Sequence, residues 1–556
     1  MVTDELKYHI RQSFGFPPTV EQEQAIGIFA DFFASPTALQ SSPLAHQPSV
    51  MILRGAAGTG KTTLAAAIVR AMVALRQKMV LMAPTGRAAK VFSLYAGQPA
   101  FTIHRRIYRQ KSFERQSVGD GVSGMGGFVL NYNAAQDTLF IVDEASMISN
   151  STSSSSFLAP SSSLLDDLIQ FVYGGRNCRL LLIGDHAQLP PVGETESPAL
   201  SAACLRGYGL HVYEATLNEV LRQAAESGIL FNATRIRGLS RCGVRGTRCE
   251  DSLEVELSGV QGALAPRTSY LAPSIRINGF SDIRVVPGDE LIEQLATSYS
   301  RVGLDDTIVV TRSNKWANIY NEGIRRTILD REDELCRGDR LMIVKNNYHW
   351  IEQSRYEVRG ARYENSFEAE SNGVQGALAP RTSHLAPRGQ DISFIANGDI
   401  AVVQRVRNIH EQHGFRFADV TMTFPDYDDF ELTATVLLDT LASEAPALTG
   451  EQQQQLFERV MADYADIPYK ADRLKKVKED RYYNALQVKF AYAVTCHKAQ
   501  GGQWAHVYVD QGYINDDMLT SEYYHWLYTA FTRATDQLFL VNWPKTQVED
   551  VGEERK

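Results

Sequence analysis

The chain has 556 residues, of which 44% are hydrophobic and 22% charged, and its 56 basic and 65 acidic side chains leave a formal net charge of −9. This ordinary globular composition excludes a disordered tail protein and a collagen-like fibre, and the length predicts three or four domains of roughly 150 residues each. Six cysteines are too few for a disulfide scaffold. Because no signal-peptide core and no run of 18 apolar residues appears, we expect a cytoplasmic protein without a membrane span. The acidic balance argues against coating nucleic acid with the whole surface, but it leaves room for a local basic channel.

Two segments nearly repeat each other. Residues 259–273 read GVQGALAPRTSYLAP and residues 373–387 read GVQGALAPRTSHLAP, a match at 14 of 15 positions. A serine-rich run at 149–163 shares the shorter SxLAP pattern. A solenoid needs many adjacent copies, whereas these two lie 114 residues apart. A recognition tag is one alternative, but insertion of a repetitive element into surface loops is favoured because added loop length costs little. We expect poor packing there, and deletion of 373–387 should leave activity intact.

Near-continuous apolar runs predict parallel strands that are covered on both faces. In chain order they are Val50–Leu53, Met79–Ala83, Leu139–Val142, Leu180–Ile183, Thr307–Thr311, Val488–Thr495, Val507–Asp510 and Leu538–Val541. They fall into two clusters about 120 residues apart, which predicts two α/β domains. The stretch at roughly 340–485 alternates more and carries more charge, and it predicts a small β unit followed by a helical piece from Glu451 to Lys478.

The strongest chemical signal is a glycine-rich loop that fits GxxxxGK[ST] between the strand Val50–Leu53 and an Ala-rich helix at Thr63–Leu75. Its glycines let the backbone wrap around phosphate oxygens, and consecutive amides at the helix N-terminus face the anion. Lys61 is expected to reach the β- and γ-phosphates, and the Thr62 hydroxyl to ligate Mg²⁺. A chance turn is the alternative, but the flanking strand and helix favour ATP binding. The predicted binding residues are Gly55, Ala56, Ala57, Gly58, Thr59, Gly60, Lys61, Thr62 and Thr63.

Two carboxylates follow the strand Leu139–Val142, at the end of a buried strand where ligands bind in open α/β sheets. Asp143 is expected to hold Mg²⁺ and Glu144 to polarise the attacking water. An acidic pair after a strand is by itself usually a loop start. Its position 82 residues after Lys61 favours the catalytic interpretation.

The strand Leu180–Ile183 also ends in a polar loop, GDHAQLPP. Its Gln188 side chain is a candidate for contact with a γ-phosphate. The two prolines, Pro190 and Pro191, are interpreted as a simple rigid turn.

With these segments the sequence resembles superfamily 1 helicases, in particular the RecD-like branch, over most of its length. Gln22 in TVEQEQAI resembles the adenine-reading glutamine of that family, and Gln22 is therefore a predicted nucleotide contact. The remaining motifs follow in the family order: Ia at Ala83–Lys90, a DNA-contacting motif at Thr102–Arg105, II at DEAS, III at GDHAQLPP, IV at Glu219–Gln223, V at Val494–Gly501 and VI at Tyr528–Ala534.

The resemblance implies an α/β fold with two RecA-like P-loop domains built on parallel sheets, with ATP in the cleft between them. Phosphoryl transfer needs positive charge at the γ-phosphate in the transition state, which arginine fingers supply. Arg222 and Arg533 are the candidates, and Arg533 would come from the second domain. A surface salt bridge is the alternative for Arg533, but its place after an apolar helix favours the finger.

By the same analogy, Thr85, His104, Thr495 and His497 would line a single-strand track across both domains. Hydroxyl and imidazole groups can bond phosphate without reading sequence. Helix capping, or an ordinary satisfied position in a loop, is the alternative for each of these residues.

Phe394–Asp399 resembles the start of the small SH3-like β insertion in the second domain of this branch. The predicted organisation is a first RecA-like domain at 1–240, with a short pin-like insertion at about 105–137, and a linker with the first repeat at 241–280. The second RecA-like domain comprises 281–345 and 486–556, interrupted by a loop with the second repeat at 346–393 and the SH3-like and helical insertion at 394–485.

The function that the resemblance implies is an ATP-dependent DNA helicase or translocase that acts on single-stranded DNA and duplex junctions, with 5′ to 3′ polarity. No nuclease constellation accompanies the motifs, and Gln22 comes early in the chain, so a standalone helicase is expected and protein partners stay open. Two alternatives remain: an RNA-directed helicase of the same superfamily, and a P-loop ATPase switch that does not translocate.

Overall fold

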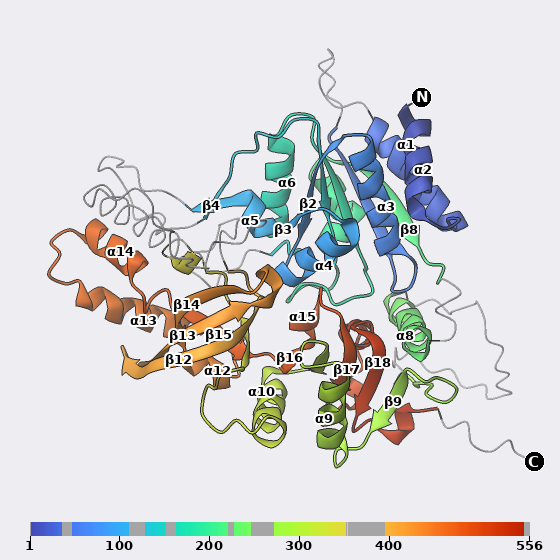
Figure 1. Cartoon of the computed structure of the whole chain (residues 1–556). Helices are drawn as coiled ribbons and strands as arrows, with labels where there is room; N and C mark the ends of the chain where they lie inside the picture. The colour runs from blue at the N-terminus through green and yellow to red at the C-terminus, as the bar shows by residue number, and fades with distance from the viewer. Residues whose placement is uncertain are drawn as a thin grey trace, which may run out of the picture.

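A computed structural model describes residues 2–35, 47–110, 128–151, 163–220, 227–245, 272–347, 349–351, 353 and 395–549. These residues form two α/β lobes, each built on a parallel sheet, with a small β-barrel beside the second lobe (Figure 1). The predicted fold class of two parallel-sheet α/β domains is therefore confirmed. The repeat at 373–387, nearly all of 259–273 and most of the serine-rich run lie outside the described residues. No helix among the described residues is long and apolar enough to cross a membrane.

The first lobe is a six-stranded parallel sheet with the strand order β3-β2-β6-β7-β1-β8. Met51 and Leu53 pack against helices on one face, and the alternate residues Val50 and Ile52 pack on the other. This burial on both faces explains the continuous apolar runs. The strands are β1 (Ser49–Gly55), β2 (Lys78–Ala83), β3 (Ala100–Thr102), β6 (Thr138–Val142), β7 (Arg179–Gly184) and β8 (His211–Leu217). The helices are α1 (Val2–Phe14), α2 (Val20–Ala34), α3 (Lys61–Ala74) and α4 (Gly86–Ala96), then α5 (Ile103–Ile107), α6 (Leu164–Gly174) and α7 (Ala202–Gly207).

The segment predicted as a pin begins and ends in a short antiparallel hairpin. Its strands are β4 (Tyr108–Gln110) and β5 (Phe128–Leu130), and the residues between them, 111–127, lie outside the described residues. A strand-separating role for this segment stays a prediction.

The second lobe is a five-stranded parallel sheet with the order β16-β10-β17-β18-β9. Helices α8 (Gly228–Arg245) and α16 (Ser521–Phe531) pack on one face, and α9 (Leu291–Arg301) and α10 (Asn314–Gly323) on the other. The strands are β9 (Ile283–Val286), β10 (Thr307–Thr311), β16 (Ala493–Thr495), β17 (Trp504–Asp510) and β18 (Ala534–Val541). The predicted domain boundaries stay predictions.

One predicted strand, Val488–Thr495, is wrong as a single element. It is divided into β15 (Leu486–Phe490) and β16, which belong to different sheets. The chain leaves the barrel and enters the second lobe at residues 491–492, so both halves are apolar for separate reasons.

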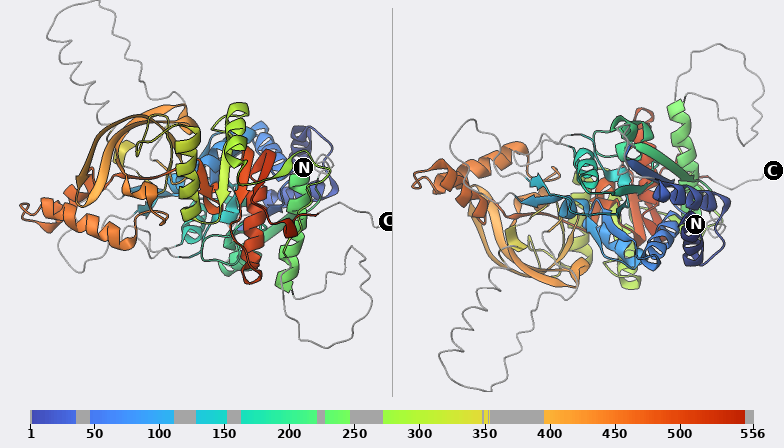
Figure 2. Two further views of the ribbon diagram at one scale, coloured as in Figure 1. Left: turned by 90° about the horizontal axis from the view of Figure 1, so that it is seen from below. Right: turned by 90° about the horizontal axis from the view of Figure 1, so that it is seen from above.

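The barrel closes in the order β11-β12-β13-β14-β15, with β14 parallel to β15 and the other described pairs antiparallel. Its first four strands are β11 (Arg340–Ile343), β12 (Ile400–Gln412), β13 (Phe415–Phe424) and β14 (Phe430–Leu437). Three helices lie between β14 and β15 in the chain: α12 (Asp439–Ala442), α13 (Gly450–Asp463) and α14 (Lys470–Glu479). The predicted helical piece is thus two helices, separated by residues 464–469. Figure 2 shows the barrel at one side of the lobes. Its likeness to SH3 domains stays a prediction.

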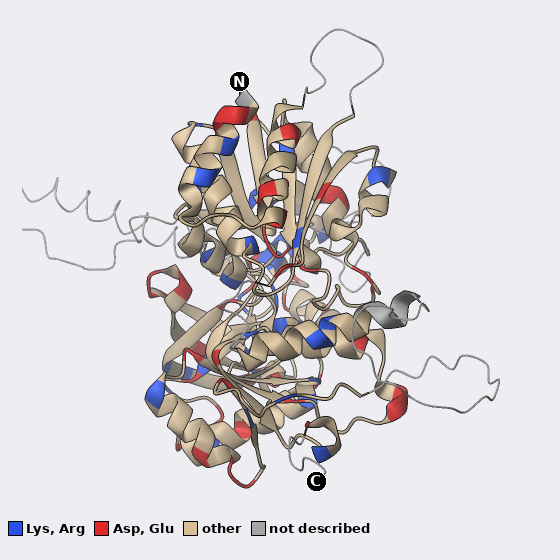
Figure 3. Cartoon of the chain, turned by 90° about the vertical axis from the view of Figure 1, so that its right-hand side faces the viewer, with Lys and Arg blue, Asp and Glu red and all other residues tan. Residues whose placement is uncertain are grey.

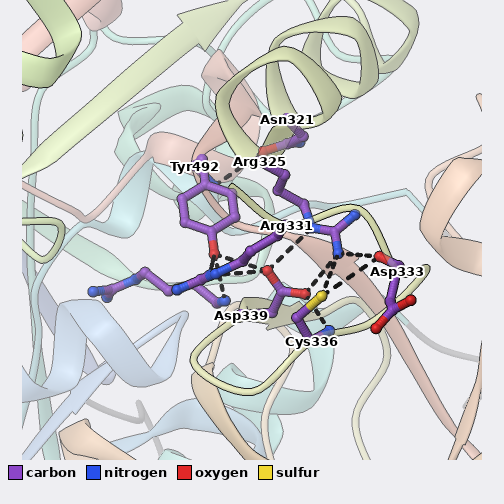
Figure 4. A network of polar contacts seen from close by, with 8 residues as sticks. Asn321, Arg325, Arg331, Asp333, Cys336, Asp339 and Tyr492 are labelled. Carbon is purple, nitrogen blue, oxygen red and sulfur yellow. Dashed lines mark hydrogen bonds and ion pairs between the residues drawn. The ribbon is translucent and has the colours of Figure 1, made fainter. Parts of the chain in front are cut away.

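A buried polar network fixes the point where the barrel joins the second lobe (Figure 4). The Asp339 carboxylate, fully buried just before β11, accepts hydrogen bonds from Arg325 Nη2 and Arg331 Nη1, each at 2.9 Å. It also accepts from Cys336 N at 2.7 Å and from the Tyr492 hydroxyl at 3.1 Å. Because Asp339 precedes the first barrel strand and Tyr492 follows the last, one carboxylate ties together both ends of the insertion.

Candidate active site

The glycine-rich loop connects β1 to α3 and folds back on itself. Gly58 and Gly60 have φ angles of 78° and 76°, in the left-handed region that glycine adopts without strain. A Cβ at Gly55 would lie 2.9 Å from Thr59 Oγ1 and 3.1 Å from Lys61 Cβ, so this glycine permits the close return. Lys61 opens the helix and Thr62 is exposed beside it. The predicted phosphate loop therefore has the expected shape, with two side chains at its mouth.

Gln22, predicted to read adenine, is buried and has both ends of its amide engaged. Its Oε1 accepts from Thr19 N at 2.9 Å in the capping box of α2, and its Nε2 donates to the Thr59 carbonyl oxygen at 3.1 Å. The side chain thus joins the N-terminal helix to the phosphate loop, and its role toward a base stays a prediction.

The acidic pair lies at the carboxyl end of β6. Asp143 Oδ1 accepts from Glu144 N at 2.8 Å, and its Oδ2 accepts from the Tyr95 hydroxyl. Glu144 has a φ of 51°, which turns the chain sharply after the strand. Both carboxylates are half-buried. The two side chains therefore lie at the carboxyl ends of the parallel strands, where the phosphate loop also leaves the sheet.

Charged side chains from both lobes act on the carboxylate of Glu144. Burial raises the pKa of Glu144, and the positive charges of Lys61 and Arg533 oppose this rise. The nearby carboxylates of Asp143 and Asp185 reinforce it. Glu144 therefore feels the phosphate-loop lysine of the first lobe and the motif VI arginine of the second, which places all three at one site.

Arg533 is 3% exposed and is held by the second lobe. Its Nε donates to the Thr529 carbonyl oxygen and its Nη1 to that of Gly502, each at 3.1 Å, and its Nη2 donates to Thr532 Oγ1 at 3.2 Å. These acceptors orient the guanidinium. The other predicted finger, Arg222, lies outside the described residues.

The loop of the first lobe that carries Gln188 is hydrogen-bonded to the second lobe. Leu189 N donates to Thr529 Oγ1 at 2.8 Å, and Gln500 Nε2 donates to the Leu189 carbonyl oxygen at 2.7 Å. Gln188 itself is buried in this loop. Sequence reasoning missed Thr529 and Gln500 as cross-lobe contacts, although polar side chains within the apolar motif VI helix were a signal that could have found one of them.

The predicted DNA-contacting residues lie in different settings. Thr85 caps α4 by accepting from Ala88 N at 3.2 Å, and a Cβ at Gly501 of the second lobe would come within 3.3 Å of its Oγ1. Thr495 stands at the N-terminus of α15 (Cys496–Ala499) with no side-chain capping bond. Thr85 therefore lies against motif V at the seam between the lobes, and the capping alternative is observed for it.

The two predicted histidines are half-buried. Burial lowers the pKa of His104 to about 4, so its ring is neutral at pH 7, and the ring packs 5.5 Å from that of Tyr108. Burial also lowers the pKa of His497. Several Lys and Arg residues lie near the boundary between the two lobes (Figure 3). Arg87 of α4 donates to the Gln503 carbonyl oxygen at 3.0 Å, and its guanidinium carbon lies 4.1 Å from the centroid of the Trp504 ring.

The donor set fits Mg²⁺ better than a protein-enclosed metal. Among the described residues there is no group of three or more His, Cys, Asp or Glu side chains that could hold a metal. Mg²⁺ commonly takes one or two protein oxygens and completes its shell with substrate phosphates and water. The exposed Thr62 hydroxyl and the Asp143 carboxylate are such oxygens.

Two protein families match the chain: the AAA domain at residues 38–237 and the UvrD-like helicase C-terminal domain at residues 490–541. The ATP-dependent RecD2 DNA helicase of Deinococcus radiodurans is 30% identical over 182 residues, which are 33% of this chain but only 21% of that protein. The uncharacterized protein R530 of Acanthamoeba polyphaga mimivirus is 22% identical over 527 residues, or 88% of this chain and 94% of that one.

Solved structures of Pif1 helicases also align with the chain. The Bacteroides enzyme in complex with ADP-AlF3 and ssDNA has a TM-score of 0.40 and 12% identity over 96% of this chain and 94% of that one. The Candida albicans enzyme has a TM-score of 0.37 and 14% identity over 96% of each chain.

The fold and the site together define the class of protein. Two lobes built on parallel sheets, with a P-loop between the first strand and the helix of the first lobe, are the arrangement of a RecA-like ATPase. The AAA-domain match in the first lobe, the UvrD-like helicase match in the second and the RecD2 relative together support a superfamily 1 helicase of the RecD-like branch. The predicted resemblance is confirmed.

Proposed function

We propose that the chain is an ATP-dependent DNA helicase that translocates on single-stranded DNA and separates strands at duplex junctions. The observation that carries this proposal is that Leu189 N and Gln500 Nε2 bond the Gln188 loop of one lobe to motifs V and VI of the other, while Lys61 and Arg533 both act on the charge of Glu144. A triphosphate bound there would contact both lobes, and its cleavage would change the contacts that hold them together.

The chemistry follows from the side chains. The loop amides and Lys61 bind the phosphates, and Mg²⁺ held by Thr62 and Asp143 would neutralise part of their charge. Glu144 takes the proton of the attacking water, and its raised pKa makes it a stronger base than an exposed carboxylate. Arg533 and Gln188 meet the γ-phosphate, where an arginine stabilises the charge of the transition state.

The nucleic-acid track of the proposal runs along the seam. Thr85 and His104 from the first lobe and Thr495 and His497 from the second bind the backbone of the single strand. Neutral hydroxyl and imidazole groups bond phosphate independently of base sequence, as a translocating motor requires. By resemblance to the RecD-like branch the direction is 5′ to 3′.

The first test is ATP hydrolysis with and without a single-stranded DNA oligomer. We expect stimulation by DNA, and loss of hydrolysis in Lys61→Ala but not in Lys78→Ala, an exposed lysine on the same sheet. ATPase activity that ignores nucleic acid would reject the helicase in favour of the P-loop switch.

The second test is strand displacement on duplexes with a 5′ or a 3′ tail. Unwinding of the 5′-tailed substrate alone is expected, and unwinding of the 3′-tailed substrate alone would refute the polarity. Competition between DNA and RNA oligomers decides the RNA-directed alternative, because the 2′-OH distinguishes the two.

A further inference from the structure

Tyr528 of α16 crosses the cleft and contacts two loops of the other lobe. Its hydroxyl accepts from Ala57 N, an amide of the phosphate loop, at 2.8 Å. The same hydroxyl donates to Asp185 Oδ2, in the loop after β7, at 2.6 Å. Tyr528 is 1% exposed, so both bonds are shielded from water.

Asp185 passes the contact on to the turn that carries Gln188. Its Oδ1 accepts from Ala187 N at 2.9 Å, and its carbonyl oxygen accepts from Gln188 N at 3.2 Å. The carboxylate is itself 1% exposed. A continuous chain of hydrogen bonds therefore runs from the phosphate loop through a second-lobe hydroxyl to the backbone that positions Gln188.

The hydroxyl is fixed in its donor role. Burial, together with the negative charge of Asp185, raises the pKa of Tyr528 well above its usual value, so the proton stays on the phenol. With one bond accepted and one donated, this group can link an amide to a carboxylate, which a phenyl ring cannot do.

We propose that Tyr528 is a cross-lobe positioning residue, whose hydroxyl sets the phosphate loop and the Gln188 turn in register when the cleft is closed. The inference rests on the proposed function, since it concerns ATP turnover at the same site. The inference gives a positioning role to a motif VI side chain other than the arginine finger. Tyr528 touches no reacting atom, but its bonds fix the positions of the phosphate loop and of Gln188, which are the groups that meet the phosphates.

The variant Tyr528→Phe keeps the ring and removes only the link. We expect kcat for ATP hydrolysis in the presence of single-stranded DNA to fall about tenfold or more, because small misplacements of catalytic groups have effects of this size. The Kd of a fluorescent ATP analogue should stay within about threefold of wild type, because most loop amides are untouched. A residue that only stabilised the fold would lower the melting temperature without separating kcat from nucleotide binding.

Tyr523→Phe is the matched control. Tyr523 lies on the same helix and is equally buried, but its hydroxyl donates to Gln511 Oε1 at 2.7 Å within the second lobe. Its kcat should stay within about twofold of wild type, as expected for a bond outside the cleft. Wild-type kcat in folded Tyr528→Phe, or an equal loss in Tyr523→Phe, would overturn the inference.

A second variant covers the case in which Tyr528→Phe does not fold. Asp185→Asn leaves one acceptor oxygen for two donors, so either the phenol or Ala187 N loses its acceptor and the chain of bonds is broken. The value of kcat should then fall while ATP still binds; unchanged kcat would overturn the inference. If Tyr528→Phe folds, the double variant should be no slower than the slower single variant, because both act on one link. Additive losses would contradict the shared chain of bonds. Absence of DNA stimulation in the wild type would instead count against the proposed function, and the basal ATPase of these variants would still test the link.

Discussion

Replacing Gly86 by alanine should loosen the contact between the first lobe and the barrel. Gly86 is the first residue of α4, and a Cβ there would lie 2.1 Å from Asp399 Oδ1 and 3.0 Å from the Tyr427 hydroxyl. The carboxylate cannot swing aside freely, because it accepts from Ala396 N at 2.7 Å and from the Tyr427 hydroxyl at 2.9 Å. The added methyl group therefore requires α4 and the barrel to move apart.

Two effects of opposite sign decide the outcome. Alanine is a better helix former than glycine by about 1 kcal/mol in a helix interior, and by less at the first position. Overpacking of a tight site costs about 1–3 kcal/mol, and a contact of 2.1 Å against a fixed carboxylate belongs at the upper end. We expect Gly86→Ala to lower the free energy of unfolding by about 1–2 kcal/mol.

The assay is denaturant unfolding of Gly86→Ala beside Gly27→Ala. Gly27 lies inside α2, where an added Cβ would meet nothing within 4 Å. The control should therefore gain about 0.5–1 kcal/mol from helix propensity alone. A Gly86→Ala protein as stable as the control would refute the close packing of α4 against the barrel.

Three further variants test single carboxylates. Glu144→Gln should bind ATP but stop hydrolysis; turnover of this variant at the wild-type rate would reject Glu144 as the base. In the wild type, kcat should rise as the pH passes the raised pKa of Glu144, because only the ionised carboxylate accepts a proton. Burial raises the pKa of Asp399 from 3.8 to about 7, so the folded state holds this proton and stability from Asp399 falls by up to about 4 kcal/mol as pH rises from about 4 to about 7. Asp399→Asn should remove this slope and gain more, relative to wild type, at pH 8 than at pH 5 in urea unfolding; an equal difference at both values would contradict the assignment. Asp339→Asn leaves Arg325 without its buried counter-charge and should cost about 3–5 kcal/mol of unfolding free energy, against about 0.5 kcal/mol or less for the exposed control Asp333→Asn; equal losses would dismiss the network as an anchor.

Local signals made most of the two sheets predictable. A strand such as β1 is covered by helices on both faces, so its apolar residues run without interruption and are visible in the sequence. The phosphate loop was equally visible, because its chemistry requires consecutive glycines between a strand and a helix. Strand β8 was missed because it lies at the edge of the sheet, where its first four residues are exposed or half-buried and give no continuous apolar run.

Contacts between distant segments could not be predicted. The run Val488–Thr495 gives no sign that a barrel ends at its centre, because both sheets bury the same residue types. The bonds of Tyr528 to Ala57 and Asp185 join residues 471 and 343 positions apart, and no pattern of spacing encodes them. The predicted roles of Thr85, Thr495 and both histidines concern a bound strand and stay predictions.

The barrel is attached to the second lobe at both of its ends and also contacts the first lobe. Asp339 and Tyr492 anchor it to the second lobe, while Asp426, just after β13, accepts from Lys90 of α4 at 2.8 Å. A hinge movement that separates the two lobes must therefore either break the contact between the barrel and α4 or change the angle at which the barrel meets the second lobe. High ionic strength weakens a partly exposed ion pair such as Lys90–Asp426. It should therefore lower the free energy needed to separate the two lobes.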